Sequence, residues 1–240
     1  MTKEFSDKIK DLLYQMYDAQ CKVNDEIFPG WLEKLDMENW EEAILVEAAE
    51  ALESAGYKWW KKQDIDEDNI KVELIDILHF KLSWLAYQTK YIFNQEISGF
   101  ISGFGKQIKD TERKTKLLKD VGKTQSMFSL AKAMKAYGLD NIEDVFKTYM
   151  TKNVLNLFRT KNGYKEGTYI KNWNGVEDNV RAFELAEKID TDNFFGNLYK
   201  ELENYYRLYV KIEVKEDNDN NRTTTKSGKR KFNKKETRAD

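Results

Sequence analysis

Hydrophobic residues recur at helical spacing along most of the chain. In the first segment, from Lys3 to Asp25, they are Ile9, Leu12, Leu13, Met16, Tyr17 and Val23. Intervals of three and four residues place such side chains on one face of an amphipathic helix. The only proline follows in Phe28-Pro29-Gly30, a segment that should end the helix. We therefore predict a first helix over residues 3–25.

The rest of the chain predicts further helices, separated by polar or glycine-containing segments. Asp36 or Asn39 is a suitable N-cap for a second helix that ends near Ala55, before Gly56. The other helices are expected over residues 70–93, 109–137, 142–159, 180–189 and 194–214. Residues 98–105 are expected to form a loop or an interrupted helix, and residues 161–179 a connector rich in glycine and asparagine.

Composition supports an all-α fold. Hydrophobic residues make up 40% and aromatic residues 13% of the 240 residues, which is enough for a sizeable core. A single proline, against a usual share of about 5%, argues against an all-β fold with many proline-containing turns. We expect a single multi-helix, bundle-like domain over residues 1–214.

The end of the chain differs in charge from the rest. Residues 222–238 contain eight basic residues, one acid and almost no hydrophobic side chains. Residues 1–221 hold 32 basic and 40 acidic residues, so the near balance of 40 and 42 in the whole chain hides an acidic body. The composition of the last residues is typical of disorder. We expect residues 215–240 to form a disordered tail, with no specific nucleic-acid binding.

The counts of cysteine and histidine exclude several kinds of site. With Cys21 as the only cysteine, the chain has no internal disulfide and no CxxC zinc site. With His79 as the only histidine, HExxH, three-histidine and 2-His-1-carboxylate metal sites are excluded. Any bound metal must therefore be held by carboxylates, which suit Mg²⁺ or Mn²⁺.

The chain also lacks the usual signals of export and membrane insertion. It contains no stretch of about 18 apolar residues, the minimum for a transmembrane helix. The charged N-terminal segment lacks the hydrophobic core of a signal peptide. We expect a cytoplasmic protein with no membrane partner.

Two pairs of acids are the strongest candidate for chemistry: Glu47-Ala-Ala-Glu50 and Glu73-Leu-Ile-Asp76. Residues three apart lie on the same side of a helix, so each pair presents two carboxylates together. If the two helices packed face to face, the four carboxylates would converge and repel one another unless divalent cations were bound.

A helical wheel, at about 100° per residue, separates the two pairs. On the helix of Glu47 and Glu50, the acids lie opposite the apolar side, so this helix fits a metal site or a solvated acidic stripe. Glu73 and Asp76 are surrounded by apolar residues on nearly all sides, and buried carboxylates need a partner or a metal. His79, one turn after Asp76, is interpreted as a core or supporting histidine rather than a ligand.

The spacing of these motifs resembles that of a known enzyme superfamily. Glu47-x-x-Glu50, then twenty-two residues, then Glu73-x-x-Asp76 is similar to the signature of the all-α nucleoside triphosphate pyrophosphohydrolases. That superfamily includes the dimeric dUTPases, the MazG-type enzymes and the phage dCTPase-dUTPases. Residues 152–159, 162–167 and 173–179 resemble the C-terminal motifs of the dimeric dUTPases, and residues 20–25 and 57–61 are similar too. The resemblance covers residues 12–179.

The resemblance implies an activity: Mg²⁺-dependent hydrolysis of dUTP, and of dUDP as a second substrate, to dUMP by a homodimer. It implies that Glu47, Glu50, Glu73 and Asp76 hold the metal, and that water attacks the β-phosphorus. Glu47 or Glu50 would accept the proton of that water, and we favour Glu47. Gln20 and Asn24 would bind the base. The other implied substrate contacts are Trp60, Lys61, Lys152, Asn156, Arg159, Tyr164, Lys165, Lys171 and Asn179.

Two alternatives remain open at the level of sequence. A side-chain amide can present either of its faces, so Gln20 and Asn24 do not distinguish uracil from cytosine. A dCTPase or dCTPase-dUTPase of the same fold is therefore the first alternative. The second is a helical interaction protein without enzymatic activity, whose acids only bind ions.

Overall fold

The computed structural model describes residues 2–109, 113–190 and 193–210. Within them the chain is 72% helical, which confirms the all-α prediction. The α-helices are α1 (Lys3–Ile27), α2 (Trp31–Lys34), α3 (Met37–Ser54), α4 (Glu67–Leu85), α5 (Lys90–Phe104), α6 (Lys114–Thr124), α7 (Met127–Ala136), α8 (Ile142–Lys161), α9 (Asp178–Ala186) and α10 (Phe194–Tyr205). The chain continues from α10 as a π-helix over Tyr206–Val210. The expected tail, residues 215–240, lies outside the described residues.

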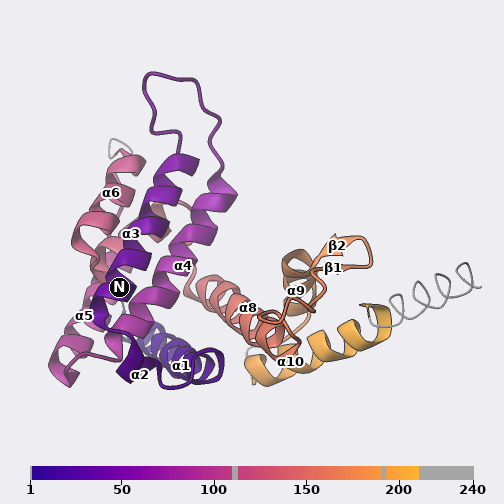
Figure 1. The fold of residues 1–240 in the computed structure, drawn as a ribbon. Helices are drawn as coiled ribbons and strands as arrows, with labels where there is room; N and C mark the ends of the chain where they lie inside the picture. The colour runs from indigo at the N-terminus through magenta and orange to yellow at the C-terminus, as the bar shows by residue number, and fades with distance from the viewer. Residues whose placement is uncertain (1, 110–112, 191–192, 211–240) are drawn as a thin grey trace, which may run out of the picture.

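The helices form a bundle with an extension. Helices α3 to α7 run side by side in the bundle, α1 crosses one end of it, and α8 leads away from it (Figure 1). Helices α9 and α10 pack on the far part of α8 together with a small hairpin. Helix α4 packs against α3, α1, α7 and α8. This central position explains why its sequence is apolar on nearly all sides.

The hairpin is the only sheet in the described residues and lies within the segment expected as a plain connector. Strands β1 (Asn172–Trp173) and β2 (Val176–Glu177) pair antiparallel. The turn residues Asn174 and Gly175 have φ of 54° and 78°, as a two-residue hairpin turn requires. Trp173 is fully buried and contacts Phe158 edge to face, with 5.7 Å between ring centroids. The hairpin thus anchors the connector on α8.

The predicted helix over residues 70–93 is wrong in its C-terminal part, because α4 ends at Leu85. The hydroxyl of Tyr87 donates to the carbonyl oxygens of Trp31 and Leu35, at 3.0 and 3.2 Å. These tertiary hydrogen bonds hold the turn that follows α4. The hydroxyl of Thr89 then accepts from the backbone N–H of Ile92 and caps α5.

The predicted helix over residues 109–137 is two helices. Gln125 adopts a left-handed conformation with φ of 49°, which ends α6. The hydroxyl of Ser126 accepts from the N–H of Ser129 and starts α7. Residues 98–104 belong to the continuous helix α5, so the loop or interrupted helix expected over residues 98–105 is wrong. Glycine serves close packing there, because a Cβ on Gly103 would lie 2.4 Å from the carbonyl oxygen of Phe128 on α7.

None of the helices in the described ranges is both long and apolar enough to cross a membrane.

Candidate functional site

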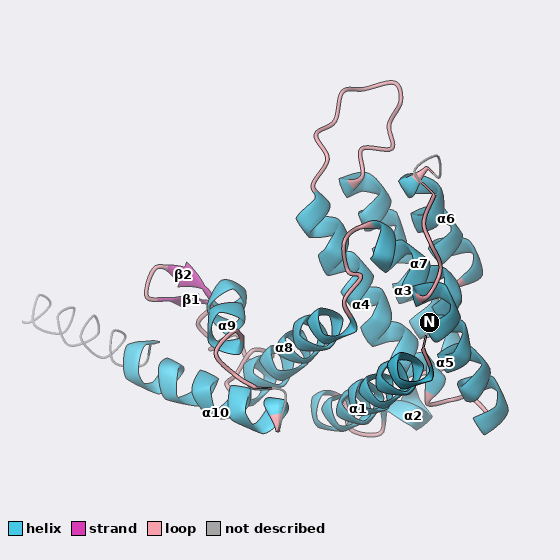
Figure 2. Ribbon diagram, turned by 180° about the vertical axis from the view of Figure 1, so that it is seen from behind, coloured by secondary structure: helices cyan, strands magenta, loops and turns pink. Residues whose placement is uncertain are grey.

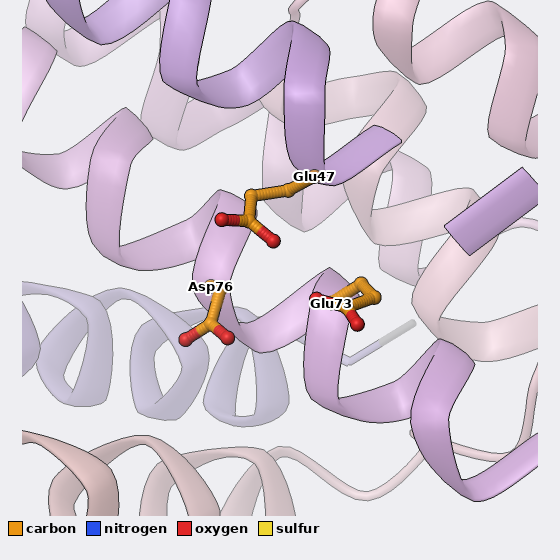
Figure 3. Close-up of side chains that lie close together, drawn as sticks. All are labelled: Glu47, Glu73 and Asp76. Carbon is orange, nitrogen blue, oxygen red and sulfur yellow. The ribbon is translucent and has the colours of Figure 1, made fainter. Parts of the chain in front are cut away.

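The carboxylates lie where α3 and α4 pack against each other. Helix α3 begins with a capping box between Asp36 and Asn39, and the side chain of Asp66 caps α4. These caps fix where each helix starts, and therefore which residues face the neighbouring helix. Glu47 of α3 faces Glu73 and Asp76 of α4 (Figure 3).

Three of the four predicted carboxylates come together. Glu47, Glu73 and Asp76 each offer an oxygen atom, and these atoms all lie within 4.8 Å of one another. Glu73 is buried, whereas Glu47 and Asp76 are partly exposed. Glu50 is exposed and lies outside this group. The structure thus brings together the acids of two helices, with Glu50 at the margin.

The proximity of the acids alters their ionisation. Burial raises the pKa of Glu47 to about 8, with further contributions from its hydrogen bond to Glu73 and from the charges of Asp76, Glu73 and Glu50. Burial also raises the pKa of Asp76, although the Lys152 ammonium opposes this. Full ionisation of these three carboxylates is therefore unfavourable unless a cation is bound.

Neighbouring side chains hold the carboxylates in place. The amide of Asn69 donates to Glu73 Oε1 and to Ser54 Oγ, both at 2.8 Å, and so connects Glu73 to the end of α3. Lys152 of α8 lies 2.5 Å from Asp76 Oδ2. Lys152 was predicted as a phosphate ligand, and its ammonium group is at the edge of the carboxylate group.

The donor chemistry fits a hard divalent cation. All three groups offer carboxylate oxygen, which Mg²⁺ and Mn²⁺ prefer. Burial, with the charges of the neighbouring acids, raises the pKa of Glu47, and a bound cation would favour its charged form. We conclude that Glu47, Glu73 and Asp76 can hold such an ion.

A cavity of about 270 Å³ adjoins the carboxylates and shares Asp76 with them. Predicted base-binding residues Gln20 and Asn24 lie in its wall. The remaining lining residues are Val23, Ile27, Phe28, Trp31, Leu35, Trp40, His79, Phe80, Asn153 and Asn156. Aromatic and apolar walls with a few polar groups are typical of a site for a small organic ligand.

Three polar atoms in residues of this wall are buried without a hydrogen-bond partner: Trp40 Nε1, His79 Nε2 and Asn153 Oδ1. Buried polar groups normally have partners, so such a concentration indicates a site that a ligand or water completes. Burial holds the pKa of His79 well below its usual value, so this ring is neutral. The residues that line the cavity therefore include one unpaired N–H donor and two further unpaired polar atoms.

Most of the predicted phosphate and sugar contacts lie elsewhere. Of the set, only Asn156 lines the cavity and only Lys152 contacts the carboxylates. Trp60 and Lys61 are exposed on the long loop between α3 and α4, seen above the bundle in Figure 1. The others belong to the last turn of α8, the segment after it and the first turn of α9: Arg159, Tyr164, Lys165, Lys171 and Asn179.

Arg159 has a partner that the sequence did not indicate. Its Nε and Nη2 donate to the two carboxylate oxygens of Asp178, at 2.7 and 2.8 Å, and the hydroxyl of Tyr169 donates to the same carboxylate. Asp178 is buried and stands next to Asn179. Arg159 also lies 5.9 Å from the ring centroid of Tyr164, and Lys171 lies 5.3 Å from it. Lys165 donates to the carbonyl oxygen of Ile27.

Sequence reasoning missed several residues of the cavity. Trp40 and Asn153 were not singled out, and Ser83, which binds Asn24, was not considered. For Asn153 a signal exists, because it is a polar residue on the mainly apolar buried face of α8. Trp40 resembles any aromatic core residue in a sequence, so its unpaired N–H requires the structure.

A sequence-family model described as dUTPase matches residues 12–164, which is more than half of the chain. No curated protein gives a significant match. The matched segment contains the carboxylates and most of the cavity wall. It ends before Lys165, Lys171 and Asn179.

Proposed function

The chain belongs to the dUTPase family, and we propose that it hydrolyses dUTP to dUMP and pyrophosphate with Mg²⁺ as cofactor. The observation that supports this most is the pairing of two features. Three carboxylates lie within 4.8 Å of one another, and one of them also lines a cavity whose wall holds unpaired polar atoms. A nucleoside in the cavity would place its phosphates toward the carboxylates.

In this proposal Glu47, Glu73 and Asp76 hold Mg²⁺, and Glu50, one turn after Glu47, completes the set. Mn²⁺ is the alternative ion, since the same oxygen ligands suit it. When bound, the cation would neutralise charge that develops on the phosphates and lower the pKa of water.

We propose Glu47 as the general base. It belongs to the carboxylate group and is partly exposed, so water can reach it. Glu50, the alternative, is outside the group. Glu47 would accept the proton of the attacking water, while Glu73, held by Asn69, keeps a fixed position.

The remaining predicted residues would bind the rest of the nucleotide. Lys152 is placed to balance the charge of Asp76 and of a phosphate. Asn156 would contact the nucleoside from the cavity wall. Arg159 and Lys171 lie beside the exposed ring of Tyr164, and basic side chains of this kind suit phosphate binding. The other proposed substrate contacts are Lys165 and Asn179, and Trp60 and Lys61 on the loop between α3 and α4.

The decisive measurement is release of pyrophosphate from a panel of nucleotides, with Mg²⁺ and with EDTA. The panel contains dUTP, dCTP, dTTP, dATP, dGTP and UTP, and release of phosphate from dUDP is measured in parallel. We expect Mg²⁺-dependent turnover with dUTP as the preferred triphosphate. Preference for dCTP would overturn the base assignment. Inertness toward every nucleotide would leave the interaction protein as the better interpretation.

Variants test the site within the same assay. Glu47→Gln and Asp76→Ala should each lower kcat/KM by about 10²-fold or more, because the first removes the proposed general base and the second a proposed metal ligand. Glu42→Gln is the matched control, since Glu42 is an exposed acid of the same helix outside the carboxylate group. Activity like that of the wild type in Asp76→Ala would contradict the assignment.

A further inference from the structure

Six buried side chains form a continuous hydrogen-bonded network beside the cavity. They come from α1, α4 and α8, which meet in the lower part of the molecule in Figure 2. The members are Gln20, Asn24, His79, Ser83, Tyr149 and Asn153, each at most 9% exposed. Gln20 and Asn24 also line the cavity, so the network fixes two groups that a ligand would touch.

The hydrogen bond from Ser83 to a backbone carbonyl sets the direction of the bonds at one end of this network. Ser83 Oγ donates its only proton to the carbonyl oxygen of His79, at 3.0 Å. The hydroxyl of Ser83 must therefore accept from Asn24, which presents Nδ2 at 2.9 Å. A backbone carbonyl cannot donate, so this end of the network has a fixed direction.

The orientation of the Asn24 amide in turn determines that of the Gln20 amide. With Nδ2 turned to Ser83, Asn24 presents Oδ1 to Gln20, whose Nε2 donates to it at 2.8 Å. Gln20 then turns Oε1 to the other side. There it accepts from the Tyr149 hydroxyl at 2.6 Å and from Asn153 Nδ2 at 2.8 Å.

His79 agrees with this assignment. Its Nδ1 lies 2.9 Å from Gln20 Oε1, an atom that only accepts, so Nδ1 carries the proton. Its ring also stacks on that of Tyr149, with 3.9 Å between centroids. Turning the amide of Gln20 over would set its Oε1 against Asn24 Oδ1, two acceptors, and its Nε2 against Asn153 Nδ2, two donors. Such buried unpaired groups are strongly unfavourable.

The fixed amides leave a defined pattern for a ligand. Gln20 keeps one free N–H, Asn24 Oδ1 keeps one lone pair, and Asn24 Nδ2 keeps one N–H: donor, acceptor, donor. The edge of uracil presents an acceptor, the N3–H donor and an acceptor, which is complementary. Cytosine has an unprotonated N3 and an amino group at position 4, so it would set acceptor against acceptor and donor against donor.

We propose that Ser83, His79, Tyr149 and Asn153 are positioning residues that hold Gln20 and Asn24 in the orientation that accepts uracil and rejects cytosine. The inference rests on the proposed function for the identity of the ligand. The pattern of the amides resolves the ambiguity between uracil and cytosine that a sequence leaves open.

Two single-atom changes test the proposal. Tyr149→Phe removes one donor to Gln20 Oε1 and keeps the stacked ring. Ser83→Ala removes the group that sets the direction. Either change should reduce the preference for uracil about tenfold, the effect of one hydrogen bond on a free-energy difference. The readouts are the ratio of kcat/KM for dUTP and dCTP, and the ratio of dissociation constants for dUMP and dCMP from calorimetry.

Thr151→Val is the matched control. Thr151 is a buried hydroxyl residue of α8 that donates to the carbonyl oxygen of Lys147, outside the network. This change can lower stability but should leave the uracil-to-cytosine ratio unchanged. A general loss of stability therefore cannot imitate the expected result.

The outcomes separate this inference from the proposed function. The inference is supported if the wild type binds dUMP more tightly than dCMP and if this ratio of dissociation constants falls in Tyr149→Phe or Ser83→Ala. The ratio should stay unchanged in Thr151→Val. If no nucleotide is hydrolysed and that binding pattern still holds, the proposed function fails and the inference stands. An unchanged ratio in both folded variants, or wild-type binding of dCMP as tight as that of dUMP, overturns the inference even if dUTP is hydrolysed. If neither dUMP nor dCMP binds and no nucleotide is hydrolysed, both the inference and the proposed function are overturned.

Discussion

Glu47 is the residue at which protonation, folding and metal binding should be coupled. In the protein without metal its pKa is raised from 4.5 to about 8, first by burial and then by its acidic neighbours. Between these values the folded protein holds a proton that the unfolded chain releases. The stabilising contribution is therefore complete below about pH 4.5 and is lost as the pH rises to about 8.

This coupling predicts a pH dependence that urea denaturation can measure. In EDTA, the wild type should lose stability relative to Glu47→Gln as the pH rises toward about 8. Added Mg²⁺ should stabilise the wild type more at the upper end of this range, because a metal ligand must be deprotonated. Glu42→Gln serves as the control. A stability difference that is independent of pH would contradict the coupling.

Asp178 illustrates a second kind of buried acid, one whose charge is balanced. Burial acts to raise its pKa, but hydrogen bonds from Arg159 and Tyr169 outweigh this and lower it. We predict that Asp178→Asn lowers the free energy of unfolding by about 1.5–3 kcal/mol, the usual worth of hydrogen bonds to a charged group. Chemical denaturation near neutral pH measures this loss.

The lowered pKa of Asp178 makes its contribution to stability depend on pH. A lowered pKa stabilises the folded state above the ordinary value of 3.8, and this stabilisation is lost as the pH falls below it. The difference between wild type and Asp178→Asn should therefore shrink in acid. Glu184→Gln, which breaks the exposed pair with Arg181 on the same helix, should cost only about 0–1 kcal/mol. Equal effects of the two changes would argue against a special role for Asp178.

At the scale of helices, local patterns predicted which segments are helical but not where helices break. Apolar spacing continues through residues 86–89, and the break there depends on Tyr87 reaching Trp31 and Leu35, which are far away in sequence. The Asn174-Gly175 turn, in contrast, is a local hairpin signal that the sequence contained.

The candidate site was likewise predictable only in part. Spacing on two helices sufficed to predict that Glu47, Glu73 and Asp76 converge, because helical geometry fixes the side on which each acid lies. The network around Gln20 could not be predicted, because it joins α1, α4 and α8 through contacts between residues up to 133 positions apart. Such contacts depend on tertiary packing rather than on local spacing.

The packing of α5 on α7 gives a prediction at this scale. Gly103→Ala should destabilise the protein by about 1–3 kcal/mol, because the new Cβ would lie 2.4 Å from a backbone oxygen that cannot turn away. Gly99→Ala is the control on the same helix, where the nearest atom would be at an ordinary 3.6 Å. There the helix preference of alanine should leave stability unchanged or raise it by about 0.5–1 kcal/mol. Urea denaturation of both variants tests the contrast, and equal stability would refute the close approach.

At the scale of the whole molecule, α3 and the loop after it expose several large apolar side chains. Leu45 and Val46 are 55% and 54% exposed, and Trp59 on the following loop is 88% exposed. Apolar side chains grouped on a surface commonly mark a contact with another protein. Because the chain belongs to a family of dimeric all-α dUTPases, we propose a second copy of the chain as the partner.

Sedimentation equilibrium tests this proposal directly. The wild type should sediment with twice the 28.4 kDa mass of one chain. Val46→Asp should raise the dimer dissociation constant at least about tenfold, because a charge would be buried without a partner. Leu208→Asp is the control, since Leu208 is 48% exposed in the π-helix, remote from α3 in sequence. A monomeric wild type would refute the dimer, and a Val46→Asp protein as dimeric as the wild type would exclude this face as the interface.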